Sequence, residues 1–225
     1  MSIEEQKILS AKKSVEYVET GMIVGIGSGT TSMHMIKALA DKVKNENLEI
    51  IAVSSSKKSQ KYAASLGIEI QDLDKVERID LSIDGIDEVN PKFEAIKGGG
   101  GALLYEKILA ANSDRYIWIA DQTKLVDKLG KFPLATEVVP YGSEHLFTRL
   151  EALGYKPSFR MTDGEKYITD SGNYIIDLHL GEIENPRKLS SKLNNLAGVV
   201  ENGLFYDAVD LLIVGTEEGA REFRN

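Results

Sequence analysis

The chain has 225 residues, enough for one large domain or for a large and a small one. Its apolar fraction of 42% and charged fraction of 28% are typical of a globular protein that folds in water. A net charge of −8, with both signs interspersed, argues against a nucleic acid or an anionic membrane as the main partner. It leaves room for a small anionic substrate, because a pocket can be locally positive on an acidic protein.

The chain contains no cysteine, which removes disulfides, thiol nucleophiles and cysteine metal sites together and fits a reducing cytosol. Residues 1–13 are charged throughout and lack an apolar core, so we expect no signal peptide. No apolar run approaches the length that crosses a membrane. We therefore expect a cytoplasmic protein.

Apolar periodicity predicts alternating helices and strands in the first half of the chain. Helices are expected at 3–20, around Met35 to Val43, in a segment that ends at Leu66, and at 102–111. Strands are expected at 22–26, 48–53, 79–83 and 116–120. This alternation is typical of a parallel sheet covered by helices on both faces. Functional groups of such sheets gather at the carboxyl ends of the strands, where Thr30, Asp84 and Asp121 are expected.

The pattern changes near Phe132. Strands are expected up to 139, at 155–161, 166–169, 174–180 and near 199, with helices at 143–153 and 187–196 and a hairpin turn at Asp163-Gly164. This order indicates a split βαβ, ferredoxin-like α+β domain, and the apolar run 211–214 is expected to return to the main sheet. The predicted fold is therefore α/β, with a mostly parallel sheet flanked by helices and a smaller inserted α+β domain. We expect the catalytic domain to comprise 1–130 and 206–225, and the smaller domain 131–205.

A glycine-rich turn, 25–31, joins the first strand to the next helix. It is not a dinucleotide fingerprint, because Thr30 stands where the third glycine belongs, and it lacks the lysine of a Walker loop. Ser28, Thr30 and Thr31 at a helix N-terminus suit a phosphate monoester better than a nucleotide. The alternative is that these side chains only cap the helix.

Three carboxylates, Asp84, Asp87 and Glu88, follow the strand at 79–83 in one loop. They favour a functional loop, although solvated turn aspartates are common. Magnesium binding is the competing interpretation, since carboxylate oxygens suit that ion. The three histidines, His34, His145 and His179, are scattered without ligand spacing, and we expect them to be structural or on the surface.

Four consecutive glycines, Gly98–Gly101, lead into the helix expected at 102–111. Such a run marks a place where the backbone must approach something closely, and the N–H groups at a helix start can bind an anion. Glu106 has apolar neighbours three and four residues away, and burying a carboxylate there is costly unless it is paired or used. The alternative is a simple turn followed by an ordinary surface glutamate.

Three stretches, 25–32, 84–90 and 97–108, resemble type A ribose-5-phosphate isomerases, as do 120–126 and 131–134. The match runs through essentially the whole chain with the spacing of that family. It implies the interconversion of ribose 5-phosphate and ribulose 5-phosphate in the pentose phosphate pathway, through an enediol and without a metal or organic cofactor. One departure is Gly101, where many members have alanine; we expect it to add flexibility at the helix start.

The resemblance also implies the roles of the site residues. Glu106 corresponds to the base, and desolvation would strengthen a carboxylate for that task. Lys97 and the N–H groups of the glycine run correspond to the donors for the enediolate oxygen, and Asp84 and Asp87 to the groups that handle hydroxyl protons, including ring opening. The implied substrate-binding residues are Ser28, Gly29, Thr30, Thr31, Gly85, Ile86, Gly98, Gly99, Gly100 and Lys124, with Lys7 assisting at the phosphate. The family suggests a homodimer or homotetramer that binds a small phosphorylated sugar.

Two other readings of the sequence stay open. One is a related enzyme, such as a sugar-phosphate deaminase or an acyl-CoA transferase that uses its glutamate as a nucleophile. The other is a sugar-phosphate sensor without catalytic activity. A sensor has no need to keep Asp84, Asp87, Lys97 and Glu106 together, and all four are present.

Overall fold

The computed structural model describes all 225 residues, which divide into two compact units. We call Met1–Ile86, Tyr105–Lys124 and Ala208–Asn225 the α/β unit, and Asp87–Leu104 and Leu125–Asp207 the α+β unit. None of the helices combines the length and the apolar composition that crossing a membrane requires.

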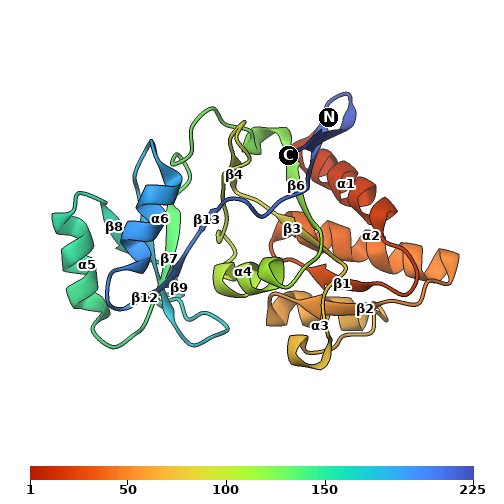
Figure 1. Ribbon diagram of the computed structural model, residues 1–225, viewed down its shortest axis with the longest axis horizontal. Helices are drawn as coiled ribbons and strands as arrows, with labels where there is room; N and C mark the ends of the chain where they lie inside the picture. The colour runs from red at the N-terminus through yellow and green to blue at the C-terminus, as the bar shows by residue number, and fades with distance from the viewer. The chain divides into compact units, whose positions relative to one another are not determined.

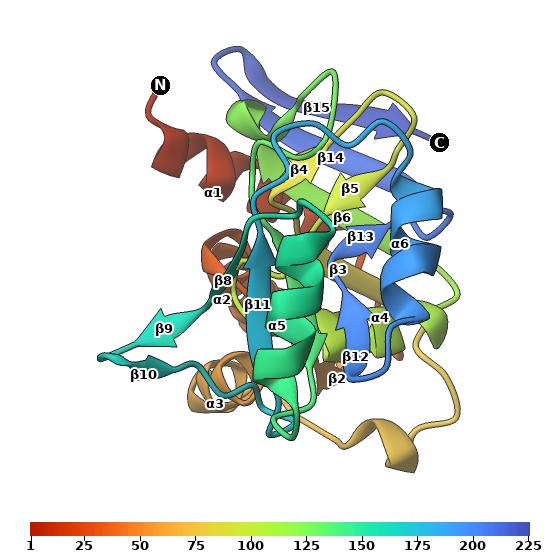
Figure 2. The ribbon, with the colours of Figure 1, turned by 90° about the vertical axis from the view of Figure 1, so that its left-hand side faces the viewer.

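A six-stranded sheet forms the centre of the α/β unit, with the order β15-β14-β6-β3-β1-β2 (Figures 1 and 2). Its strands are β1 Ile23–Ile26, β2 Ile51–Ser54, β3 Leu81–Gly85, β6 Tyr116–Asp121, β14 Leu211–Thr216 and β15 Gly219–Arg224. The first five run parallel, and β15 pairs antiparallel with β14 at one edge. The predicted parallel sheet and the return of the chain at 211–214 are confirmed.

Local sequence signals set the ends of the helices in this unit. They are α1 Ile3–Ser14, α2 Thr30–Glu46, α3 Lys57–Ser65 and α4 Leu103–Ala111, with short 3₁₀ turns η1 Val15–Tyr17, η2 Leu73–Lys75 and η3 Gln122–Lys124. The first two residues of α4 belong to the α+β unit. The α1 helix starts at a capping box, in which the Ser2 side chain accepts from the Glu5 N–H and the Glu5 carboxylate accepts from the Ser2 N–H. It ends earlier than the expected residue 20, because the chain tightens into η1.

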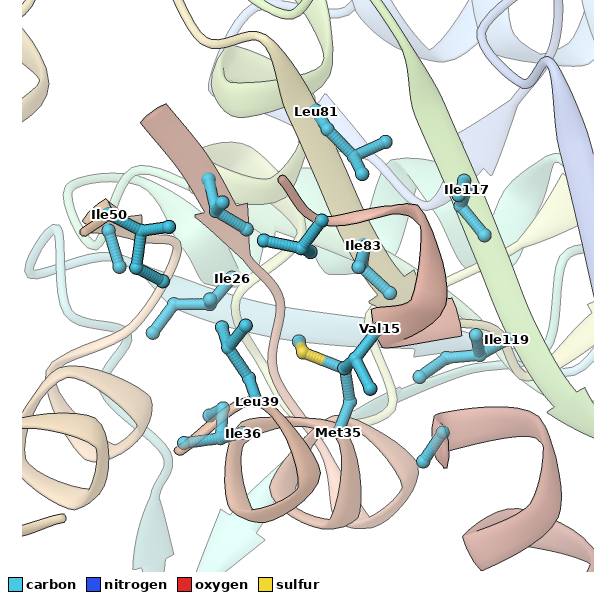
Figure 3. Close-up of a cluster of buried hydrophobic side chains, with 14 of the residues drawn as sticks. Val15, Ile26, Met35, Ile36, Leu39, Ile50, Leu81, Ile83, Ile117 and Ile119 are labelled. Atoms are coloured by element: carbon cyan, nitrogen blue, oxygen red, sulfur yellow. The ribbon is translucent and has the colours of Figure 1, made fainter. Parts of the chain in front are cut away.

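The main core lies between one face of the sheet and helices α1, α2 and α3. Figure 3 shows Ile83, Ile117 and Ile119 of the strands facing Val15 and Met35, and all of these side chains are buried. Parallel strands that are buried on both faces consist largely of apolar residues, so their positions could be predicted from the apolar runs in the sequence. A smaller cluster, Val53, Ile79 and Leu109, connects α4 to the sheet.

The α+β unit contains a four-stranded antiparallel sheet with the order β12-β7-β11-β8. Its elements are β7 Leu134–Val138, α5 Ser143–Ala152, β8 Pro157–Phe159, the hairpin β9 Met161–Thr162 and β10 Glu165–Lys166, then β11 Tyr174–Leu178, α6 Pro186–Asn194 and β12 Val199–Asn202. Figure 2 shows α5 and α6 on the same side of this sheet. The expected ferredoxin-like order is confirmed, because the fourth strand lies beside the first and the third beside the second.

Alternation along these strands separates the two faces of the sheet. Leu134 and Ile176 pack in the cluster that includes α5 and α6, whereas Ala135 and Ile175 pack with Leu103 and Tyr167 in a separate cluster. The face without helices is therefore the one that meets the end of the glycine run.

A three-stranded sheet, with the order β13-β5-β4, was not predicted. Its strands are β4 Glu88–Val89, β5 Ala95–Ile96 and β13 Leu204–Phe205. This pairing attaches residues 87–104 to the α+β unit, so the compact units divide the chain at other points than 130 and 206. The expected domain boundaries stay a prediction.

Candidate functional site

The carboxyl end of β3 holds Asp84 against the loop that follows β1. Asp84 is 2% exposed, and its Oδ1 accepts hydrogen bonds from Ser28 N at 3.0 Å, Ser32 Oγ at 3.2 Å and Gly85 N at 2.7 Å. A Cβ on Gly27 would lie 1.8 Å from this same oxygen, so only glycine fits there. Asp84 thus fixes the shape of the glycine-rich loop.

Glu106 lies in the first turn of α4 and is 3% exposed. Its Oε1 accepts a hydrogen bond of 2.5 Å from Ser28 Oγ, a length typical of a hydroxyl that donates to a carboxylate. Ser28 therefore contacts Asp84 through its backbone and Glu106 through its side chain. The alternative of an ordinary surface glutamate is wrong, because this carboxylate is buried and paired.

The start of α2 carries two features suited to an anion. Gly29 is the N-cap residue with a φ of +91°, and no side chain caps the helix, so the interpretation of Ser28, Thr30 and Thr31 as helix caps is wrong. The positive end of the helix dipole lies here, and Lys7 Nζ donates to Thr30 Oγ1 at 3.1 Å. Thr30 is exposed and Thr31 is buried.

Lys124 is carried by the η3 turn, whose backbone is anchored at two points. Asp121 is fully buried and its Oδ1 accepts from Thr123 N at 2.9 Å, while Gln122 N donates to Gln6 Oε1 at 3.2 Å. Because Gln6 belongs to α1, the Lys124 turn is tied to the helix that also carries the lysine beside Thr30. Two cationic side chains are thereby attached to neighbouring, well-fixed segments.

In the α+β unit, Asp87 contacts the glycine run directly. Its backbone N donates to Ile96 O at 2.9 Å, and its Oδ2 accepts from Gly99 N at 2.8 Å. A Cβ on Gly99 would lie 2.7 Å from Asp87 Oδ1 and 3.0 Å from the Phe132 ring. Gly99 must therefore be glycine if the carboxylate is to reach the backbone.

Lys97 precedes the glycine run and is 1% exposed, which is unusual for a lysine. Its backbone N donates to Gly203 O at 2.9 Å, and its Nζ lies 5.3 Å from the centre of the Phe205 ring. An ammonium over an aromatic face is stabilised by a cation–π interaction. The lysine is thus held inside the unit rather than extended into water.

Gly101 has a backbone conformation and a close neighbour that a residue with a Cβ would not accommodate. It is buried with a φ of +83°, and a Cβ there would lie 2.5 Å from the Tyr167 hydroxyl oxygen. Burial raises the pKa of Tyr167.

Of the remaining predicted site residues, Ile86 and Gly98 are buried and Gly100 is exposed.

Glu88 has a structural role that distinguishes it from the two aspartates before it. It is 4% exposed, and its two carboxylate oxygens accept from Gly130 N at 2.7 Å and Phe132 N at 2.6 Å. The acidic loop therefore splits into three residues with different contacts. No group of three or more histidine, aspartate or glutamate side chains is arranged as metal ligands.

We predict that Glu88→Ala lowers the free energy of unfolding by about 1.5–3 kcal/mol, because one buried and one partly buried N–H group lose a charged acceptor. Urea denaturation followed by circular dichroism measures this change. Glu88→Gln is the matched control and should lose less, since it keeps the shape and one acceptor oxygen. Unchanged stability together with lost turnover would contradict the structural role.

Comparison with known proteins shows which family the chain is similar to. The model of ribose 5-phosphate isomerase A (phosphoriboisomerase A) matches residues 51–219. Ribose-5-phosphate isomerase A of Levilactobacillus brevis is 54% identical over 214 residues, covering 95% of this chain and 94% of that protein; the Streptococcus gordonii protein is 46% identical and covers 97% of each. A D-ribose-5-phosphate isomerase in complex with phospho-erythronic acid is 37% identical, with a TM-score of 0.96 and complete coverage of both chains. The Methanocaldococcus jannaschii structure is 35% identical with a TM-score of 0.94, again over both complete chains.

Proposed function

Because the chain belongs to the ribose 5-phosphate isomerase A family, we infer that it interconverts D-ribose 5-phosphate and D-ribulose 5-phosphate, a step of the pentose phosphate pathway. This aldose–ketose isomerisation moves a proton between C2 and C1 through an enediol. The observation that carries the inference within the structure is the buried Glu106 carboxylate, held by Ser28 beside Asp84 at the carboxyl end of the parallel sheet. Ligands of such sheets bind at this edge.

We propose that Glu106 is the base. In the forward direction its carboxylate takes the proton from C2 of the open-chain aldose while the C1 oxygen gains a proton, which gives the enediol. The C2 hydroxyl then loses its proton and becomes the ketone carbonyl as Glu106 returns its proton to C1. The Ser28 hydroxyl orients the carboxylate by its hydrogen bond to Oε1. Burial favours the reaction, because a carboxylate that has lost water is a stronger base.

We propose that the α2 N-terminus binds the substrate phosphate. The Lys7–Thr30 hydrogen bond and the uncapped helix start support this role, together with Thr31 and Gly29. Lys124, on a turn fixed to α1, supplies a second cation. A doubly charged phosphate fits this combination better than a neutral sugar hydroxyl does.

We propose that Lys97 and the N–H groups of Gly98 and Gly100 stabilise the enediolate oxygen, whereas the Gly99 N–H holds Asp87 beside the substrate by its hydrogen bond of 2.8 Å to Oδ2. Asp84 and Asp87 move hydroxyl protons and open the furanose ring, and Gly85 and Ile86 complete the substrate contacts beside Asp84. The buried position of Lys97 supports this role, because an ammonium in a low-dielectric environment acts strongly on nearby developing charge. No metal or organic cofactor is required for an enediol step with a protein base and protein donors.

The substrate class in this proposal is a small phosphorylated sugar. We also propose a cytoplasmic homodimer or homotetramer without nucleic-acid or membrane partners. Size-exclusion chromatography with light scattering tests the assembly state directly, since a monomer, a dimer and a tetramer of a 24.8 kDa chain differ twofold or more in mass.

Proton NMR of ribose 5-phosphate in D₂O, with enzyme and excess chelator, tests the reaction. We expect ribulose 5-phosphate to appear with deuterium from solvent at C1, because the base exchanges its proton before returning it. Ketose formed without deuterium would indicate a hydride shift or a shielded base. No ketose at all would contradict the isomerase function and favour a sensor or a transferase.

A further inference from the structure

Arg160 connects the sheet of the α+β unit to the glycine run. Its Nη1 donates to Gly98 O at 2.8 Å and to Gly99 O at 3.2 Å. Its Nε donates to Asp177 Oδ2 at 2.9 Å, and its Nη2 donates to the other oxygen of the same carboxylate. One guanidinium therefore contacts two consecutive peptide carbonyls and one carboxylate.

The contacts fix the orientation of a single peptide plane. The Gly98 carbonyl and the Gly99 N–H belong to the same peptide bond, so they point in opposite directions. Arg160 Nη1 and the Gly101 N–H, the latter at 3.0 Å, both donate to the carbonyl, and Asp87 Oδ2 accepts from the Gly99 N–H at 2.8 Å. Because Gly98 has a φ of +101° and glycine has few steric restraints, this plane would rotate readily without such contacts.

The arginine is itself held firmly. Asp177 lies on β11, one residue from Ile176, which packs with the helices, so its side chain belongs to the opposite face. The Arg160 backbone N donates to Ile175 O at 2.9 Å, and its carbonyl accepts from Tyr167 N at 2.8 Å. The Arg160 and Asp177 side chains are only 17% and 14% exposed. The sheet therefore fixes the Arg160–Asp177 pair, and the pair in turn fixes the backbone of the glycine run.

We propose that Arg160 is a positioning residue for the isomerase reaction. It holds the carbonyl groups of Gly98 and Gly99 on its own side, so that the N–H groups of Gly99 and Gly100 face away from it. Through the Gly99 N–H it also fixes the position of the Asp87 carboxylate. The guanidinium does this without touching the substrate. Arginine is suited to the task because its rigid fork bridges a carboxylate and a second acceptor, which a lysine ammonium does not reproduce. This inference rests on the proposed function of the glycine run.

The test compares Arg160→Lys and Arg160→Met with Arg187→Met. Arg187 also forms a two-bond pair with a carboxylate, Asp207, in the same unit, but it does not contact the glycine run. We expect both Arg160 variants to lose about 10–100-fold in kcat with KM changed less than about threefold, since a misplaced group costs turnover more than binding. Arg187→Met should keep kcat within about twofold of the wild type.

Two further measurements separate positioning from general damage. Phospho-erythronic acid, the ligand of a structurally similar isomerase, has a planar, negatively charged carboxylate that resembles an enediolate in shape and charge. Its inhibition constant should rise in parallel with the loss in kcat/KM. The amide resonances of Gly98–Gly100 should shift, and their hydrogen exchange should accelerate, in Arg160→Lys but not in Arg187→Met.

The outcomes are distinct. Wild-type kcat in folded Arg160 variants, or an increase in KM alone, would overturn the positioning role and leave the isomerase function standing. An inactive wild type would overturn the proposed function. The amide resonances of Gly98–Gly100 would still test whether Arg160 fixes the backbone of the glycine run. If Arg160→Met fails to fold, Arg160→Lys and Asp177→Asn carry the test, and unchanged glycine amides in both would overturn the inference.

Discussion

Glu106→Gln is expected to reduce kcat by about 10²–10⁴-fold, the usual contribution of a general base. The carboxamide keeps the size of the side chain and can still accept the hydrogen bond from Ser28 Oγ, so the helix and the loop should stay in place. What it loses is the ability to take a proton from carbon. The steady-state rate of ketose formation measures the loss directly.

The controls for this prediction are conservative. Circular dichroism and the thermal midpoint should match the wild type, and phospho-erythronic acid should still bind, because the proposed phosphate contacts are untouched. Deuterium incorporation into unreacted and reacted sugar should fall together with kcat. A folded Glu106→Gln enzyme with full turnover would remove Glu106 from the role of base and direct attention to the two aspartates.

The fold was predictable where one local signal decided the structure. Strands β1, β6 and β14 are largely continuous apolar runs, and a buried parallel sheet needs such runs. Strand β15 escaped prediction because it is an edge strand with charged residues, as edges usually are. The two-residue strands β4, β5 and β13 carry no periodicity, so only their tertiary pairing defines them.

The candidate site was predictable as a set of motifs but not as a set of contacts. Each motif lies where a strand or a glycine run ends, and such ends can be recognised in the sequence itself. The hydrogen bond from Ser28 to Glu106 joins residues 78 positions apart, and that from Tyr116 to Asp84 spans 32. The hydrogen bond from Arg160 to the Gly98 carbonyl joins residues 62 positions apart, and no sequence motif indicates it. Such contacts depend on the order of the strands in the sheets, and local sequence patterns do not determine that order.

The acidic loop illustrates why residue type was insufficient. Asp84, Asp87 and Glu88 are equivalent carboxylates in the sequence, and a magnesium site was a reasonable competing interpretation. In the structure each faces different donors: the Ser28 loop, Gly99 N–H, and the backbone of Gly130 and Phe132. Each carboxylate is therefore fixed by its own set of backbone N–H and hydroxyl donors, and these sets differ between the three residues.

Lys97→Ala is expected to remove about 3–4 kcal/mol of transition-state stabilisation, the usual cost of losing one oxyanion donor. At 25 °C this corresponds to a reduction in kcat of about 10²–10³-fold. The substrate carbonyl carries little charge in the ground state, so KM should change much less than kcat. Steady-state kinetics in both reaction directions check this, because the same enediolate forms from either sugar.

Lys97→Met distinguishes the lost charge from the lost volume. Lys97 is almost completely buried beside the Phe205 ring, so alanine leaves a cavity that lowers stability as well as activity. Methionine fills the same space, makes a favourable contact with the aromatic ring and carries no charge. If the ammonium acts on the enediolate, both variants lose turnover equally, although only Lys97→Ala loses stability. If Lys97→Met regains most of the activity, the lysine serves packing, and the N–H groups of the glycine run must stabilise the enediolate alone.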